Sequence, residues 1–225
     1  MSTAGSAEAS PWEPWNSGLY AQVVDAREGD LSLRDGEGWY MTLDVGRWSR
    51  RADAGDHSVV ERCAGRVLDI GCGAGRIVEA LTLRGHQALG IDVCPSAVVA
   101  TVCRGGAARG GSVFDPLPEE GRWDTALLMD GNIGIGGEAR LLLRRVRELV
   151  HDQGLLIVET SRADVDERRR VRIHVGQRAA SPAFPWAVVG AHALMRHARL
   201  SGWAVAEEWA TTSAERHFVA LRALA

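Results

Sequence analysis

The stretch that decides the fold is Arg66-Val67-Leu68-Asp69-Ile70-Gly71-Cys72-Gly73-Ala74-Gly75-Arg76. It opens as a short apolar run, which is typical of a buried strand in a parallel sheet. Three glycines at alternate positions follow, and residues 77–81 then have helical character. A strand, a glycine turn and a helix bring bare backbone and a positive helix end up to a ligand.

The glycine spacing indicates the kind of ligand. A dinucleotide site has the pattern G-x-G-x-x-G, which seats a pyrophosphate on the helix N-terminus. Counted from Gly71, that pattern needs a glycine at position 76, where the chain has Arg76. Asp69 would also repel a pyrophosphate, but it suits a ligand with an amino group. A nicotinamide-dependent oxidoreductase is therefore disfavoured, and a glycine turn without a ligand is the other alternative.

This turn resembles the first motif of the class I S-adenosylmethionine-dependent methyltransferases. The resemblance implies that the turn lies along the methionine part of S-adenosyl-L-methionine, whose product is S-adenosyl-L-homocysteine. It also implies that the acid serves the ammonium group of the cofactor, often through water. The cofactor contacts expected from the motif are Asp69, Gly71, Cys72, Gly73 and Gly75.

A second acid follows at the expected distance. The strand predicted over 88–91 ends at Asp92, 21 positions beyond Gly71. A carboxylate about 20 residues after a glycine turn can accept hydrogen bonds from both ribose hydroxyls. The family uses an acid at this place for the ribose of its cofactor, so we expect Asp92 and Val93 in the cofactor site.

The adenine end of the site departs from the family pattern. We expect a short third strand over 112–114, whose tip usually carries an acid in this family. Here Asp115 comes two or three residues late, so we expect adenine to meet the backbone of Val113 and Phe114. Asp115 is equally well explained as a turn residue before Pro116.

A fourth strand, 123–130, has an apolar run directly before Asp130 and leads into a loop with four glycines in seven residues. The resemblance places the transferred methyl group and its acceptor at this loop, which implies that Asp130, Gly131 and Asn132 lie near the sulfonium. A flexible connector is the alternative. The helix predicted over 138–150 should bury one face, formed by Leu141, Leu142, Val146 and Leu149.

Three residues are candidate catalytic bases. Glu159 ends the fifth strand, 155–158, and is a candidate general base or substrate anchor, or equally a structural strand end. His174 and His192 are weaker candidates, and a lone helical histidine such as His192 is more often structural. A base is needed only if the acceptor has a proton to lose.

The N-terminal part is expected to cover the site. Residues 1–14 look disordered, and 15–61 read as an interrupted helical lid with helical pieces at 19–24 and 39–48. Four of the eight tryptophans precede residue 50, and their rings would attract a sulfonium and exclude water. Tyr20 and Tyr40 are the expected polar members of this wall. Simple packing of the segment onto the sheet edge is the alternative.

Residues 161–186 form an insertion. The alternation of Val171, Ile173 and Val175 with polar residues predicts a strand, and six arginines between 162 and 178 mark either a solvated edge or a roof over an acidic acceptor. Trp186 would belong to the hydrophobic floor of that roof. A helix over 190–200 and an antiparallel hairpin, 203–209 with 217–221, complete the chain.

The expected fold class is α/β: a doubly wound, mostly parallel seven-stranded sheet with a terminal antiparallel hairpin. The methyltransferase domain should span 62–225, with its ligand over the carboxyl strand ends at the switch in strand order. This hairpin is also the habitual ending of the family.

Composition limits the partners. The 225 residues are 46% apolar with a net charge of −3, so no global field attracts nucleic acid or anionic membrane. The four cysteines lack metal-ligand spacing, and we expect no metal, a reduced cytoplasmic protein and no membrane segment. The oligomeric state is left open.

We therefore expect methyl transfer to an oxygen, nitrogen or carbon nucleophile of a small molecule, by analogy a natural-product intermediate. An RNA or protein methyltransferase, or a non-catalytic cofactor-binding partner protein, is the alternative.

Overall fold

A computed structural model describes residues 31–211 and 216–225. The expected disordered start, the helical piece at 19–24 and the aromatic residues Trp12, Trp15 and Tyr20 lie outside the described residues.

Seven strands form the main sheet in the order β11-β12-β7-β6-β3-β4-β5. Their bounds are β3 (Arg66–Ile70), β4 (Gln87–Asp92), β5 (Ala107–Gly110), β6 (Trp123–Leu128), β7 (Val150–Thr160), β11 (Trp203–Thr211) and β12 (Arg216–Ala223). The five strands β3 to β7 pair in parallel, and β12 pairs antiparallel with both β7 and β11. The predicted fold class and its terminal hairpin are confirmed.

Helices cover both faces of this sheet. Successive strand side chains point to opposite faces, so Val67 packs with α4 (Ala54–Val60) and α5 (Arg76–Leu83). Leu68 packs on the other face with α7 (Ala139–Leu149) and α8 (Ala191–Arg199). The helix α6 (Pro95–Cys103) contacts β4 and β5.

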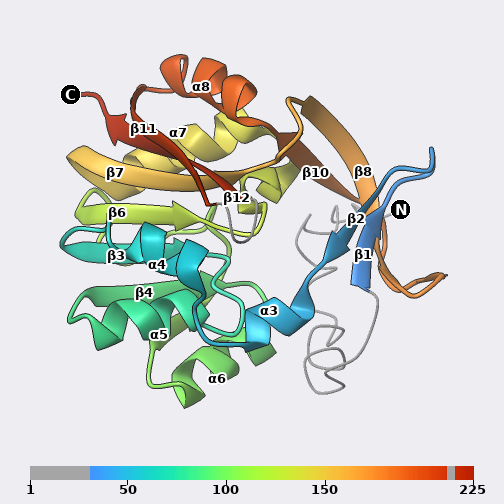
Figure 1. The fold of residues 1–225 in the computed structure, drawn as a ribbon, viewed down its shortest axis with the longest axis horizontal. Helices are drawn as coiled ribbons and strands as arrows, with labels where there is room; N and C mark the ends of the chain where they lie inside the picture. The colour runs from blue at the N-terminus through green and yellow to red at the C-terminus, as the bar shows by residue number, and fades with distance from the viewer. Residues whose placement is uncertain (1–30, 212–215) are drawn as a thin grey trace, which may run out of the picture.

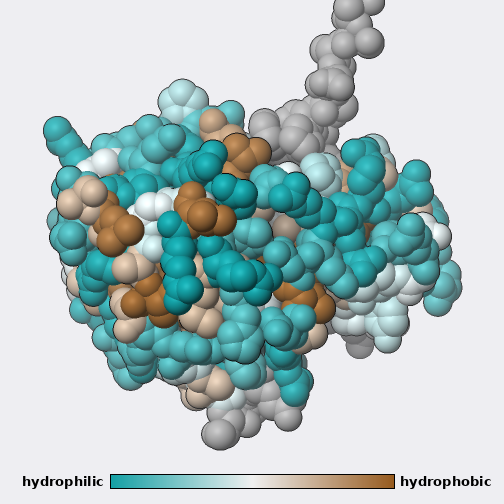
Figure 2. Space-filling view, turned by 90° about the horizontal axis from the view of Figure 1, so that it is seen from above, coloured by the Kyte–Doolittle hydropathy of each residue, from teal (hydrophilic) through white to brown (hydrophobic). Residues whose placement is uncertain are grey.

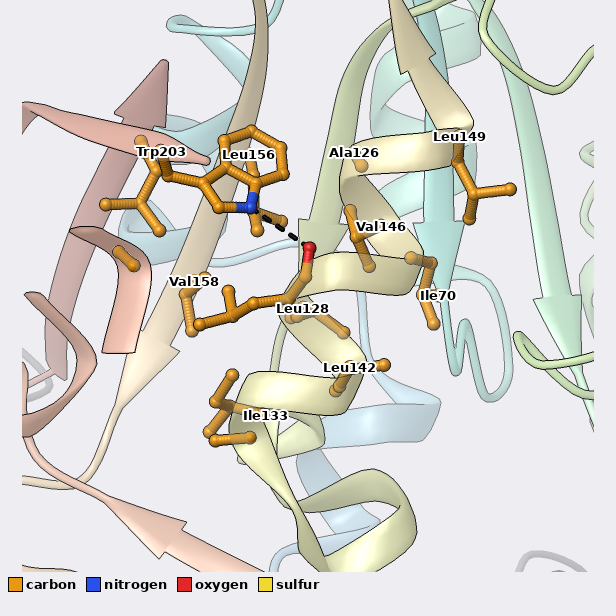
Figure 3. Close-up of a cluster of buried hydrophobic side chains, with 14 of the residues drawn as sticks. Ile70, Ala126, Leu128, Ile133, Leu142, Val146, Leu149, Leu156, Val158 and Trp203 are labelled. Atoms are coloured by element: carbon orange, nitrogen blue, oxygen red, sulfur yellow. Dashed lines mark hydrogen bonds between the residues drawn. The ribbon is translucent and has the colours of Figure 1, made fainter. Parts of the chain in front are cut away.

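The buried face of α7 differs from the expected one by one residue. Leu142, Val146 and Leu149 point toward the strands, as expected (Figure 3). Leu141 is 58% exposed and was wrongly placed on this face, whereas Leu143 is fully buried. The Leu143 carbonyl accepts a hydrogen bond from the indole N–H of Trp203 at 3.0 Å (Figure 3), which ties α7 to the closing hairpin.

A smaller sheet lies beyond the strand ends of the main sheet, on the side to which β6 points (Figure 1). Its strand order is β10-β8-β1-β2, with β9 paired to β8. The bounds are β1 (Leu31–Arg34), β2 (Tyr40–Leu43), β8 (Asp166–Val175), β9 (Arg178–Ala179) and β10 (Phe184–Val189). Two segments far apart in the chain thus build one sheet, and the predicted strand in the insertion is confirmed.

The helix expected over 39–48 is wrong for residues 39–44. Residues 31–43 form an antiparallel hairpin around a turn at 35–38, in which an Asp35 Oδ accepts hydrogen bonds from the N–H groups of Glu37 and Trp39. Leu31 and Leu33 of β1 and Met41 and Leu43 of β2, each pair two residues apart, pack in one apolar cluster, which is the period of a strand. Helical structure begins only at α3 (Val45–Ser49), which follows the hairpin.

The third strand is also displaced from its expected place. It is the edge strand β5, which is mostly exposed and therefore carries no apolar pattern. Residues 112–114 lie in a turn instead, where Ser112 N–H donates to Asp115 Oδ2 and Asp115 N–H to the Ser112 carbonyl, both at 3.0 Å. Asp115 is therefore a turn residue, which was one of the two explanations considered for it.

The surface over α7 and α8 is mainly hydrophilic, with hydrophobic residues in small scattered groups (Figure 2), as is normal for a protein surface in water. Within the described ranges, no helix is long and apolar enough to cross a membrane.

Candidate active site

A cleft lies at the carboxyl ends of β3, β4 and β6, where the strand order reverses. This is where ligands bind in open α/β sheets. Its sheet-side wall comes from the β3–α5 turn and the ends of β4 and β6, and the small sheet and α3 close the opposite side. The residues lining that opposite side are Leu43, Trp48, Phe184, Pro185 and Trp186.

The β3–α5 turn has the backbone that its glycines require. Gly71 and Gly73 have φ of +74° and +54°, in the left-handed region that favours glycine. Asn132 fixes the turn because its Nδ2 donates to the carbonyls of Ile70 and Gly71 at 2.9 and 3.0 Å. A Cβ on Gly71 would lie 2.4 Å from that nitrogen, so the turn presents main chain to the cleft.

Asp92 lines the cleft at the end of β4. Its Oδ2 accepts the Gly73 N–H at 2.9 Å and its Oδ1 the Cys94 N–H at 2.8 Å. Each carboxylate oxygen has two lone pairs, so both retain capacity for a further donor such as a ribose hydroxyl. Burial raises the pKa of Asp92, although these backbone N–H groups oppose the shift.

Asp69 lies beneath the turn, only 2% exposed, and does not line the cleft itself. Its Oδ2 is buried without a hydrogen-bond partner. Burial raises the pKa of Asp69 to about 7, although the nearby Arg76 guanidinium opposes the shift. The buried Oδ2 can therefore still take part in a further hydrogen bond.

The model of the methyltransferase-domain family matches residues 48–208. The chain belongs to this family. The family assignment made from the glycine turn is therefore confirmed. A curated ubiquinone biosynthesis O-methyltransferase from Azorhizobium caulinodans is 31% identical over 101 residues, which is 42% of this chain. The match spans only 40% of that relative.

Solved methyltransferase structures share the whole fold. A SAM-dependent methyltransferase from Bacteroides fragilis, in complex with S-adenosyl-L-homocysteine, superposes with a TM-score of 0.76 at 19% identity over 98% of both chains. The 1,6-didemethyltoxoflavin-N1-methyltransferase of Burkholderia thailandensis superposes with a TM-score of 0.63 at 17% identity. The superposition covers 99% of this chain and 94% of that enzyme's chain. At these identities the likeness shows the fold.

A buried ion-pair network lies below the methyltransferase cleft. Arg76 donates to both oxygens of Asp56 at 2.8 and 3.1 Å and to both oxygens of Asp130 at 2.7 and 3.0 Å. Burial alone would raise the pKa of Asp56, but Arg76 and Arg216 lower it to about 2. The same balance lowers the pKa of Asp130, where the guanidinium groups of Arg76 and Arg47 outweigh burial.

Glu159 belongs to this network. Arg216 Nε and Nη2 donate to its two oxygens at 2.8 and 2.7 Å, and the Asp130 N–H donates to its Oε2 at 2.9 Å. Arg216 Nη1 continues to Asp56 at 2.8 Å. The geometry therefore gives Glu159 the structural role at the strand end, which was one of the two alternatives.

A second cavity adjoins the cleft and shares Leu43, Trp48, Asp130 and Trp186 with it. Arg47 of α3 lines this cavity and forms an ion pair with Asp130. The remaining lining residues are Met41, Thr42, Asp44, Gly131, Ile133, Glu159, Thr160, Ser161, Ala187, Val188 and Val189. The cavity thus lies between the network and the small sheet.

The structure brings together most of the expected cofactor residues. Those that line the cleft are Gly71, Cys72, Gly73, Asp92, Val93, Val113, Asp130 and Asn132. Gly75 begins α5 behind them, and Gly131 lines the second cavity. Phe114 donates its N–H to Ser112 Oγ at 3.2 Å, so the structure gives no support for an adenine contact from that group.

The other expected residues are spread apart. Trp186 lines both cavities, but Tyr40 is 67% exposed and lines neither. His192 is an exposed residue of α8 whose Nδ1 lies 3.3 Å from Asp164. His174 is on β8 opposite Ser32, and its buried Nδ1 lacks a partner. Because neither histidine lines the cleft or the second cavity, the geometry favours neither as a base.

Sequence reasoning missed the network and the walls that the small sheet supplies. Arg76 was noticed only because it breaks the dinucleotide pattern, and Arg47, Asp56 and Arg216 gave no signal of their own. Among the described residues, no three His, Cys, Asp or Glu side chains are grouped to hold a metal ion.

Proposed function

We propose that this enzyme binds S-adenosyl-L-methionine in the cleft and transfers its methyl group to a small molecule held in the second cavity. The observation that carries the proposal is the pairing of a glycine turn with Asp92, 2.9 Å from the Gly73 N–H. The carboxylate retains capacity for two hydroxyl donors, and the turn offers bare main chain beside it.

The remaining residues of the cleft would orient the cofactor. Asp92 would hold the ribose, Val113 would lie against the adenine, and the Gly71–Gly73 backbone would carry the methionine part. Asp69 would face its ammonium, and that interaction would favour the charged carboxylate. When bound, the cofactor supplies a methyl group on a positively charged sulfur, which leaves as a neutral thioether.

Leu43, Trp48, Asp130 and Trp186 border both cavities, so an acceptor in the second cavity would lie next to the sulfur. The small sheet and α3 would roof the acceptor and exclude water, which is the role we propose for 161–186. Positioning of this kind supplies up to about 7–11 kcal/mol of the barrier in well-oriented systems.

The first test is calorimetry of the full chain with S-adenosyl-L-homocysteine and, separately, with NADH. We expect saturable binding of the nucleoside thioether and none of NADH. The reverse order of affinity would refute the proposal. Turnover of labelled S-adenosyl-L-methionine with a panel of small hydroxyl and amine compounds then tests the chemistry.

A second candidate function rests on the outer face of β8. Arg168, Arg170 and Arg172 are exposed at alternate positions, and Arg34 of β1 lies opposite Arg172. Such a row suits a polyanion, which favours an RNA acceptor. RNA binding that weakens steeply with added salt would support this candidate over a small-molecule acceptor.

A further inference from the structure

Resting on the proposed function, we propose that the methyl acceptor binds the second cavity as a planar anion with an already ionised oxygen nucleophile, and that Arg47 holds this oxygen. The acceptor class is then an acidic phenol or enol, rather than an alcohol or an alkyl amine.

The first reason is that the described lining residues of the cavity include no free base. Its acidic residues are Asp44, Asp130 and Glu159, and none of its described residues is a histidine or a cysteine. Glu159 accepts from both nitrogens of Arg216 at 2.7–2.8 Å, and Asp130 is held by two arginines. Carboxylates stabilised in the charged form by guanidinium groups are poor proton acceptors.

The remaining acid does not change this conclusion. Asp44 is exposed and caps α3 by accepting the Arg47 N–H at 2.9 Å. An acceptor that needed a proton removed would therefore find no suitable group among the residues described here. An acceptor that arrives ionised needs none.

The second reason is a vacant donor on Arg47. Its Nη2 is paired with Asp130, but its Nε is buried and has no partner among residues 31–211 and 216–225. A buried donor left unpaired is unfavourable, and a hydrogen bond to an ionised oxygen would remove this cost and add charge attraction. Arg47 belongs to α3, which borders the same cavity.

The balance of charges around Arg47 is compatible with a bound anion. The buried network pairs Arg47, Arg76 and Arg216 with Asp56, Asp130 and Glu159, three charges of each sign. Two further carboxylates, those of Asp44 and Asp53, face solvent at least in part. The buried Asp69 also lies near the network, but it lines neither cavity, and burial raises its pKa toward the uncharged form. The network itself therefore presents no surplus of negative charge to an anion at Arg47.

The third reason is the shape of the walls. Trp48 and Trp186 border the cavity, and Met41, Ile133 and Val189 add apolar surface. Aromatic walls favour a flat ring, which packs face or edge onto them. In the transfer, an electron pair of the ionised oxygen forms the bond to the methyl carbon, and the pair of the broken carbon–sulfur bond stays on sulfur. No proton is released.

The test uses 4-nitrophenol, a planar phenol whose ionised form absorbs visible light. The probe is titrated with pH at saturating S-adenosyl-L-homocysteine, whose binding is first measured by calorimetry on the same protein. We expect saturable binding and a decrease of at least one unit in the pKa of the bound probe. Arg47→Gln should abolish this decrease, and the exposed Arg51→Gln should leave it intact.

Arg47→Lys provides the second variant, since it keeps the charge but has no Nε. It should retain the fold, bind S-adenosyl-L-homocysteine as the wild type does, and reduce the pKa decrease by more than half. If S-adenosyl-L-homocysteine fails to bind the wild type, the proposed function itself fails. If it binds but millimolar 4-nitrophenol does not, or binds with an unchanged or raised pKa, only this inference is overturned. A decrease that survives in both Arg47 variants removes Arg47 from the site.

Discussion

Arg76 donates to both carboxylate oxygens of Asp130, at 2.7 and 3.0 Å, although 54 positions separate the two residues in the chain. The pair joins the first turn of α5 to the end of β6, on either side of the glycine turn. Arg76 also binds the fully buried Asp56 of α4. The residue that replaces the last glycine of a dinucleotide motif is thus the centre of the ion-pair network below the cleft.

Arg76→Gln should lower the free energy of unfolding by about 3–5 kcal/mol, because it leaves Asp56 and Asp130 buried with less compensation. Urea denaturation measures the change. Arg66→Gln is the matched control, since Arg66 pairs with Glu119 at the surface and should change the stability by less than about 1 kcal/mol. Equal effects from the two variants would contradict the importance of the network.

Asp69→Asn should change how stability depends on pH. The folded pKa, about 7, lies above the unfolded value of about 3.9, so the contribution of Asp69 to the stability of the wild type is largest below pH 4 and is lost as pH rises through 7. Asparagine does not titrate, so the stability of the variant relative to the wild type should rise by about 2–3 kcal/mol between pH 5 and pH 8. Thermal or urea unfolding at both pH values checks this, and a difference independent of pH would exclude a raised pKa.

Much of this fold follows from local pattern, whereas the site is only partly accessible from it. Apolar runs followed by Asp69 and Asp92 identify the central strands, the cofactor turn and the expected ribose acid. The edge strand β5 could not be predicted, because it is exposed to solvent and its Ala107–Gly110 sequence carries no period of two.

The remaining errors arise from long-range pairing. The β1–β2 hairpin is stabilised by β8, more than 130 residues later in the chain, so its own sequence did not indicate the strands. The network joins Asp56 to Arg216 across 160 positions. No sequence pattern reports such a pair, because its charge compensation exists only in the folded protein.

Asp92→Ala should weaken S-adenosyl-L-homocysteine binding by about 1.5–3 kcal/mol, or roughly 10- to 150-fold, the range for hydrogen bonds to a charged group. Calorimetry measures the affinity. Asp92→Asn keeps one acceptor oxygen, so its affinity for S-adenosyl-L-homocysteine should lie between those of the wild type and the alanine variant. Wild-type affinity in the alanine variant would remove Asp92 from the cofactor site.

Gly73→Val should weaken cofactor binding more than Asp92→Ala does. The side chain would enter the cleft, and φ of +54° is strained for a β-branched residue. Gly36→Val is the control, because a Cβ there meets nothing within 4 Å in the β1–β2 turn. Fluorescence titration with the cofactor compares the two variants, and tight binding by Gly73→Val would disprove a close backbone contact.

The most direct measurement is a crystal structure of the full chain with S-adenosyl-L-homocysteine. The account predicts its ribose hydroxyls within hydrogen-bond distance of Asp92, its methionine part along Gly71–Gly73, and its sulfur directed toward the cavity that Arg47 lines. Density for the nucleoside elsewhere on the molecule, or an empty cleft at saturating ligand, would contradict it.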